Sequence, residues 1–229
     1  MSALSSTPDQ QQIVTIDGPA GSGKSTVAVS LALLLNATLI NSGSLYRAVT
    51  KHYLRISRER NMSPDMEEFA TWVEVYMDIT IADGAVTETF CTPVAMAELK
   101  SHEINQNISE VSAYPPIRAW VNNRLHQYVA SLAEATVICE GRDAGHVIFP
   151  NAQTKLYLTA TAEVRAERIG ETAQQVTDRD DADRRKVVGN LLTVEEARSL
   201  GYYIFDSSTL SAGEVLELAI DSVNQTFPI

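Results

Sequence analysis

Short apolar runs alternate with segments of helical periodicity along most of the 229-residue chain. The apolar runs predict strands at 13–17, 38–40, 136–139, 155–159 and 203–205. In the first helical segment, Val27, Leu31 and Leu34 fall on one face. Strands that alternate with helices predict an α/β fold, in which a parallel sheet is covered by helices on both faces.

Prolines and capping residues mark where two further helices begin. Pro115 and Pro116 open a long helix, because proline in the first turn lacks only an N–H group that has no helical partner there. The apolar stripe of this helix consists of Ile117, Val121, Leu125, Tyr128 and Leu132. Ser211 and Glu214 have the spacing of a capping box, which predicts that the closing helix starts at Ser211.

The segment from about residue 62 to residue 112 interrupts this alternation. Ser63-Pro64 predicts the start of a helix with Phe69, Trp72, Val73 and Tyr76 on its apolar face. Alternating runs on either side of Asp83-Gly84 predict a β-hairpin, and a second helix is expected from about Pro93 to Ile108. We expect this compact piece to be an inserted subdomain that covers a substrate.

The turn after the first strand has the most specific motif of the chain. It reads Gly18-Pro19-Ala20-Gly21-Ser22-Gly23-Lys24-Ser25 between a predicted strand and a predicted helix, which is the context of a phosphate-binding loop. Lys24 would reach the β- and γ-phosphates, and the Ser25 hydroxyl would ligate Mg²⁺. The alternative is a glycine-rich turn without a ligand. We expect a nucleoside triphosphate to contact Gly18, Ala20, Gly21, Ser22, Gly23, Lys24, Ser25 and Thr26.

Composition and charge narrow the classes of partner. The net charge of −11 argues against broad binding of nucleic acid or of anionic membranes, and no apolar run reaches the length of a membrane span. Residues 1–12 resemble neither a signal nor a transit peptide and are predicted to be a disordered tail before one domain at 13–229. Cys91 and Cys139 form no C-x-x-C pair, so reduced thiols in a cytoplasmic protein are expected.

An acidic protein that handles phosphates must concentrate its basic residues at the site. Segment 41–47 follows the second predicted strand and ends in Arg47, and segment 140–146 follows the third and contains Arg142. Ligands of open α/β sheets bind beyond the carboxyl ends of the strands, so we expect a second substrate there. From its position alone, Arg47 is equally consistent with a role in binding this substrate and with a helix residue exposed to solvent. Arg118 stands in the first turn of its helix, where the dipole disfavours a cation, which hints at a ligand.

The charged run at 178–186 admits more than one interpretation. As a helix, it would place Arg179, Asp183 and Lys186 on one face. It would also pair Asp180 with Arg184, and Asp181 with Arg185, at i,i+4. The run alone therefore favours an exposed helix with surface salt bridges over a functional face.

Several separated motifs together resemble one family. They read T-I-D-G-P-A-G-S-G-K-S, S-G-S-L-Y-R, S-E-V-S-A-Y-P-P-I-R, G-R-D-A-G-H-V-I-F-P-N-A, R-D-x-x-D and D-S-S-T-L-S. In this order they resemble the bacterial cytidylate kinases from Ile13 to about Val223. The resemblance implies a three-layer P-loop kinase with an NMP-binding subdomain inserted at about 62–112 and a short lid at about 170–190. It implies a monomer that transfers the γ-phosphoryl group of ATP, with Mg²⁺, to CMP or dCMP.

The resemblance also implies roles for single residues. Lys24, Arg142 and Arg179 would be catalytic, Ser25 would ligate the metal, and Asp143 would help to read the base. The acceptor nucleotide would contact Ser42, Tyr46, Arg47, Ser109, Arg118, Arg142, Asp143, Asp183 and Lys186. Guanidinium forks suit phosphate oxygens, and an acceptor that is already anionic requires no strong general base.

The chain departs from the family pattern around the acceptor and the lid. Asn41 and Glu140 stand where the family has Asp, His146 stands for Thr, and Lys100 and Lys186 stand for Arg. A lysine donates as a point charge without bidentate geometry, so the choice among CMP, dCMP and UMP stays open.

Two other functions also stay open. One is a kinase of the same fold that acts on another monophosphate or on a phosphate-free metabolite. The other is a divergent ATP-binding protein with weak transferase activity. A regulatory GTPase is disfavoured because no N-K-x-D sequence follows the phosphate loop.

Overall fold

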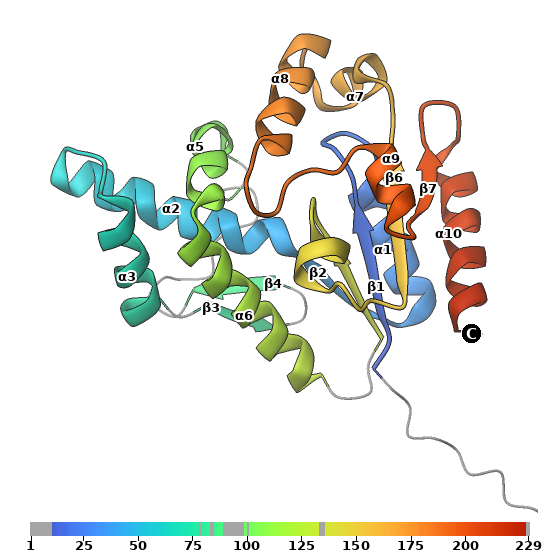
Figure 1. The fold of residues 1–229 in the computed structure, drawn as a ribbon, viewed down its shortest axis with the longest axis horizontal. Helices are drawn as coiled ribbons and strands as arrows, with labels where there is room; N and C mark the ends of the chain where they lie inside the picture. Colours follow the sequence, from blue (N-terminus) through green and yellow to red (C-terminus); the bar gives the residue numbers. More distant parts are fainter. Residues whose placement is uncertain are drawn as a thin grey trace, which may run out of the picture.

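The computed structural model describes residues 11–77, 79–82, 85–88, 99, 101–132 and 136–227. At its centre is a five-stranded parallel sheet in the order β2-β5-β1-β6-β7, with helices on both faces (Figure 1). Its strands are β1 Ile13–Asp17, β2 Thr38–Asn41, β5 Val137–Glu140, β6 Thr154–Thr159 and β7 Tyr203–Asp206. The predicted α/β fold with a parallel sheet is confirmed.

Helices join the strands, and a short antiparallel hairpin lies apart from the main sheet. The helices are α1 Lys24–Leu35, α2 Ser42–Arg60, α3 Met66–Tyr76, α5 His102–Ala113, α6 Pro115–Ser131, α7 Ala162–Ile169, α8 Ala173–Arg184, α9 Val194–Ser199 and α10 Ala212–Thr226. The hairpin consists of β3 Ile79–Ala82 and β4 Ala85–Glu88, and η1 Ala144–Ile148 is a π-helical turn after β5. The predicted capping box of the closing helix is present at Ser211 and Glu214.

The sheet separates two apolar cores. On one face, α1 and α10 pack against the strands, and the core includes Val27, Leu31 and Val215. On the other face, α2, α3 and α6 form a larger core that contains the predicted stripe residues Ile117, Val121 and Leu125. Leu34, which the helical spacing places on the same face as Val27 and Leu31, is 59% exposed. The face of α1 that meets the sheet is instead formed by Val27, Ala28, Leu31 and Ala32.

Helix α3 begins after the predicted Ser63-Pro64 start. Asp65 is its N-cap, and one carboxylate oxygen accepts hydrogen bonds from the backbone N–H groups of Glu67 and Glu68 at 2.9 and 3.1 Å. Phe69 and Val73 are buried as predicted, whereas Tyr76 is 59% exposed in the last turn. The helix starts at this later point because the Asp65 carboxylate satisfies the free N–H groups of the first turn.

The hairpin predicted in the insertion is confirmed by the antiparallel pairing of β3 with β4. Its central Asp83-Gly84, together with Pro93, Cys91 and Lys100, lies outside the described residues. The second helix of the insertion, α5, ends at Ala113, beyond the predicted end, and packs against α2. A substrate-binding role for residues 62–112 stays a prediction.

The charged run at 178–186 forms the end of α8 and the loop after it, and its predicted surface pairs are wrong. Asp180 is buried and pairs with Arg165 of α7, with an N–O distance of 2.7 Å. Its exposed neighbour Asp181 pairs with Arg184 at 3.3 Å. Helical spacing cannot predict this outcome, because Arg165 reaches Asp180 from a different helix.

The domain begins slightly before the predicted boundary. Residues 1–10 lie outside the described part of the chain. Gln11 and Gln12 fall within the predicted tail, yet Gln11 donates to the carbonyl of Val129 at 2.7 Å and the Gln12 carbonyl accepts from Val137 at 2.8 Å. Within the described residues, no helix combines the length and the apolar character that a membrane crossing requires.

Candidate functional site

The phosphate loop connects β1 to α1, as the motif predicts. Gly21 and Gly23 adopt φ angles of 74° and 89°, a left-handed region that a side chain would disfavour. No side chain caps the N-terminus of α1, so its first N–H groups are available to an anion. A cavity of about 410 Å³ lies over this turn, and its lining includes Gly21, Ser22, Gly23, Lys24, Ser25 and Thr26.

Two predicted donor residues lie elsewhere. Gly18, with φ 140°, packs so closely on the carbonyl of Leu158 that a Cβ atom would collide with it. Ala20 lines a second cavity. The loop therefore forms part of the wall of both cavities.

Lys24 is held inside the loop. Its ammonium group donates a hydrogen bond to the carbonyl of Pro19 at 2.6 Å. Burial, together with the positive charge of Arg142, lowers the pKa of Lys24 to about 7, while Glu140 acts in the opposite direction. A phosphate anion at this position would stabilise the protonated form and would raise this pKa.

Glu140 connects the metal candidate Ser25 to the end of β2. The Ser25 hydroxyl donates to Oε1 of Glu140 at 3.1 Å, and the side-chain amide of Asn41 donates to the same oxygen. The other oxygen, Oε2, is buried and has no hydrogen-bond partner among the described residues. A hydroxyl beside a carboxylate oxygen with spare acceptor capacity fits the oxygen ligands that Mg²⁺ prefers.

The second cavity, of about 180 Å³, lies beyond the carboxyl ends of β2 and β5. Every residue that the resemblance assigns to the acceptor lines it: Ser42, Tyr46, Arg47, Ser109, Arg118, Arg142, Asp143, Asp183 and Lys186. Arg179 lines it as well. The sequence motifs missed further lining residues, among them Asn105, Ser112 and Gly189.

Arg118 and Asp143 form a buried ion pair at one end of this cavity. Arg118 also donates to the carbonyl of Ser112 at 2.9 Å, and its guanidinium carbon lies 5.0 Å from the centre of the Tyr46 ring. The cation in the first turn of α6 is therefore compensated by a carboxylate and an aromatic face. The backbone at Gly189 packs directly against this ion pair, and a Cβ atom there would collide with both charged groups.

Arg142, Asp183 and Lys186 form a second charged group. Asp183 pairs with Nε of Arg142 at 3.3 Å and with Nζ of Lys186 at 2.8 Å. Burial alone would raise the pKa of Asp183, but Arg142 and Lys186 outweigh it and hold this pKa below its usual value. Arg142 also donates to the Gly18 carbonyl at 3.3 Å, so it reaches from the second cavity to the phosphate loop.

Arg47 and Arg179 approach the same cavity from α2 and α8. Arg47 donates to the Leu99 carbonyl at 3.1 Å and to the side-chain carbonyl of Asn105 at 2.5 Å. Burial lowers the pKa of Arg47, and the charges of Arg142 and Arg179 add to this effect. Arg47 is therefore partly buried and hydrogen-bonded, and its charge contributes to a basic cavity suited to an anionic ligand.

Residues that line neither cavity hold the backbone of the site in place. The buried carboxylate of Asp17 accepts hydrogen bonds from the N–H groups of Ala144 and Gly145 at 2.8 and 2.7 Å, and from the Tyr202 hydroxyl at 2.9 Å. These bonds fix the turn that follows Arg142 and Asp143. Next to it, burial lowers the pKa of His146 although the charge of Asp17 opposes the shift.

Comparison with known proteins identifies the family. The family model described as cytidylate kinase matches residues 14–225. The chain belongs to the cytidylate kinase family. A protein named cytidylate kinase from Shewanella halifaxensis is 30% identical, over 96% of this chain and 98% of the relative. A protein of the same name from Shewanella baltica (strain OS155) is 31% identical, over 95% of this chain and 96% of the relative.

Among solved structures, TT1252 from Thermus thermophilus is similar to this chain with a TM-score of 0.50. The alignment covers 95% of this chain and 98% of that chain at 19% sequence identity. At this level of identity the similarity supports the fold alone.

Proposed function

We propose that the protein transfers the γ-phosphoryl group of ATP to the 5′-phosphate of CMP or dCMP and so forms CDP or dCDP. The observation that supports this proposal is the presence of two cavities that share one phosphate loop as part of their walls. One cavity is lined by the loop residues that would bind the donor. The other is lined by the basic residues that the family motifs assign to the acceptor.

On the donor side, the backbone N–H groups of the loop and the start of α1 would bind the phosphates of ATP. Lys24 would exchange its hydrogen bond with Pro19 for the β- and γ-phosphates. Bound Mg²⁺ would neutralise part of the charge that develops on the phosphates during transfer. In this proposal Ser25 and Glu140 hold the metal, and Asn41 orients the Glu140 carboxylate.

On the acceptor side, Arg47, Arg142 and Arg179 would bind the 5′-phosphate and place it in line with the donor. Arginine forks bind phosphate oxygens at fixed angles. Because Arg142 also contacts the Gly18 carbonyl, it is positioned between the two anions. Phosphoryl transfer requires alignment and charge neutralisation more than a general base, and the acceptor phosphate is itself the nucleophile.

The nucleoside of the acceptor would lie toward the buried Arg118–Asp143 pair. This pair presents both donors and acceptors of hydrogen bonds, which suits the polar edge of a pyrimidine. Ser109 and Tyr46 would complete this end of the cavity, and Asp183 would contact the ribose. A nucleotide that cannot satisfy the buried pair would leave charged groups without partners, which opposes its binding.

Steady-state kinetics with a panel of monophosphates tests the proposal. Purified protein with Mg-ATP should release ADP rapidly with CMP and dCMP, more slowly with UMP, and hardly at all with AMP or GMP. Preference for another monophosphate, or for a phosphate-free metabolite, would replace the proposed acceptor. ATP binding without any acceptor-dependent release of ADP would identify a divergent ATP-binding protein and would contradict the proposal.

A further inference from the structure

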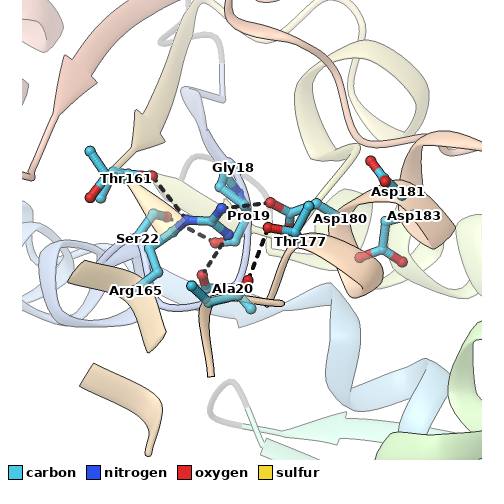
Figure 2. A network of polar contacts seen from close by, with 12 residues as sticks. Gly18, Pro19, Ala20, Ser22, Thr161, Arg165, Thr177, Asp180, Asp181 and Asp183 are labelled. Carbon is cyan, nitrogen blue, oxygen red and sulfur yellow. Dashed lines mark hydrogen bonds and ion pairs between the residues drawn. The ribbon is translucent and has the colours of Figure 1, made fainter. Parts of the chain in front are cut away.

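A single buried arginine joins the phosphate loop to α8. The Arg165 side chain donates from Nε to the Ala160 carbonyl at 2.9 Å, from Nη1 to the Ala20 carbonyl at 3.3 Å and from Nη2 to Asp180 at 2.7 Å. Figure 2 shows this guanidinium between the loop at Gly18 and Ala20 and the helix that carries Asp180. One side chain thus connects the end of β6, the phosphate loop and α8.

The link is buried and separate from both cavities. Arg165 is 5% exposed and Asp180 is 2% exposed, and neither is among the described residues that line a cavity. Two charges are rarely buried together unless they are paired and hydrogen-bonded. Their pairing therefore holds the loop and α8 at one relative position rather than serving as a contact for a ligand.

The two ends of the link belong to the phosphate loop and to α8. Ala20 itself lines the second cavity, but it belongs to the loop whose next residues, Gly21 to Thr26, line the cavity proposed for the donor, and its carbonyl accepts the Arg165 hydrogen bond. On α8, Arg179 precedes Asp180 directly and Asp183 lies one turn later, and both line the acceptor cavity. A change in the position of the loop would thus be passed to the acceptor side chains through one rigid group.

We propose that the Arg165–Asp180 pair makes donor and acceptor binding mutually favourable, because it holds Arg179 and Asp183 in place once the phosphate loop is occupied. Both residues of the pair are positioning residues that touch neither nucleotide. This inference rests on the proposed function for the identity of the two ligands. Thermodynamic linkage requires the effect to be reciprocal, so each nucleotide should raise the affinity for the other by the same factor.

Variants that break the ion pair provide the test. The double variant Arg165→Met with Asp180→Leu replaces the pair by apolar side chains of similar length, an exchange that buried ion pairs often tolerate. Asp181→Asn is the matched control, since it removes the neighbouring aspartate of the same helix, whose pair with Arg184 is exposed. Asp180→Asn is a second variant that keeps the volume of the side chain should the double variant unfold.

Calorimetric titration of CMP, with and without the non-hydrolysable Mg-ATP analogue that has an imido β,γ-bridge, measures the effect. In the wild type and in Asp181→Asn, the analogue should tighten CMP binding about tenfold, within the usual range of coupling between sites. In the double variant, and in Asp180→Asn, this factor should fall to about 1–2. A folded variant that keeps the full factor, or a wild type that shows none, would overturn the inference.

Hydrogen exchange separates failure of this inference from failure of the proposed function. The analogue alone should protect the amides of residues 173–184 in the wild type and leave them unprotected in the double variant, whatever the acceptor is. If CMP does not bind but this protection is present, the acceptor assignment fails and the link stands. If CMP is phosphorylated but the protection is equal in both proteins, only the link fails.

Discussion

The donor and acceptor sides of the site are built in different ways. The phosphate-binding part of the donor side is one continuous turn between β1 and α1, formed by backbone groups, Lys24 and the Ser25 hydroxyl, while β6, α7 and α10 contribute further walls of its cavity. The acceptor side collects side chains from α2, α5, α6, the turn after β5, and α8. The first depends on local chain geometry, whereas the second depends on tertiary packing and on ion pairs such as Arg118–Asp143 and Arg142–Asp183. Changes to the two sides should therefore have separable effects.

Lys24→Ala should have the largest effect because it removes the charge that would follow the transferred phosphoryl group. We expect turnover to fall about a thousandfold or more, with the fold retained. Initial rates measured beside thermal unfolding check this prediction. Substantial activity in a folded Lys24→Ala protein would show that phosphoryl transfer does not require Lys24.

Arg142→Ala should damage the acceptor side more than the donor side. Loss of the guanidinium should lower kcat/KM for CMP about a hundredfold, while binding of ATP in the absence of CMP should change little. The pair of measurements is steady-state kinetics with CMP and calorimetry with ATP. Equal losses in both would argue that Arg142 acts through the loop rather than at the acceptor.

Gly189→Ala should affect acceptor binding through the backbone wall beside Arg118 and Asp143. An added Cβ atom would push this buried pair apart. We therefore expect the KM for CMP to rise about tenfold, which corresponds to about 1.4 kcal/mol of binding free energy. The KM for ATP should not change. Gly201→Ala is the matched control, because Gly201 has φ 79° but no atom within 4 Å of the place that a Cβ atom would take. A similar KM for CMP in both variants would show that the collision has no effect on the acceptor.

The pKa of Lys24 predicts the smallest effect, confined to the donor side. Burial lowers this pKa to about 7, and bound phosphates should raise it again, so donor binding takes up a proton above pH 7. Affinity for Mg-ATP should therefore weaken as pH rises, by about fivefold between pH 7 and pH 8. Calorimetry in buffers of different ionisation enthalpy measures the proton uptake, which should vanish in Lys24→Met. A pH-independent affinity would contradict the assignment.

The same contrast explains what the sequence could predict. The loop and the strand–helix order follow from local pattern, and the alternating apolar runs correctly predict the parallel sheet. The family motifs name residues that line the second cavity, but they assign no role to the residues that hold these side chains in place. Asp17, Arg165 and Gly189 act through contacts with distant segments. Helical spacing assigns Asp180 to the wrong partner because it considers only one helix.

The central claim is that both cavities act together in one transfer reaction. Ion-pair chromatography of the reaction of purified protein with Mg-ATP and CMP tests it directly, since CDP and ADP elute separately, with an assay for inorganic phosphate beside it. If both cavities act together, CDP and ADP should appear in equal amounts, and neither should form when CMP is left out. ADP that accumulates together with inorganic phosphate, without CDP, would contradict it.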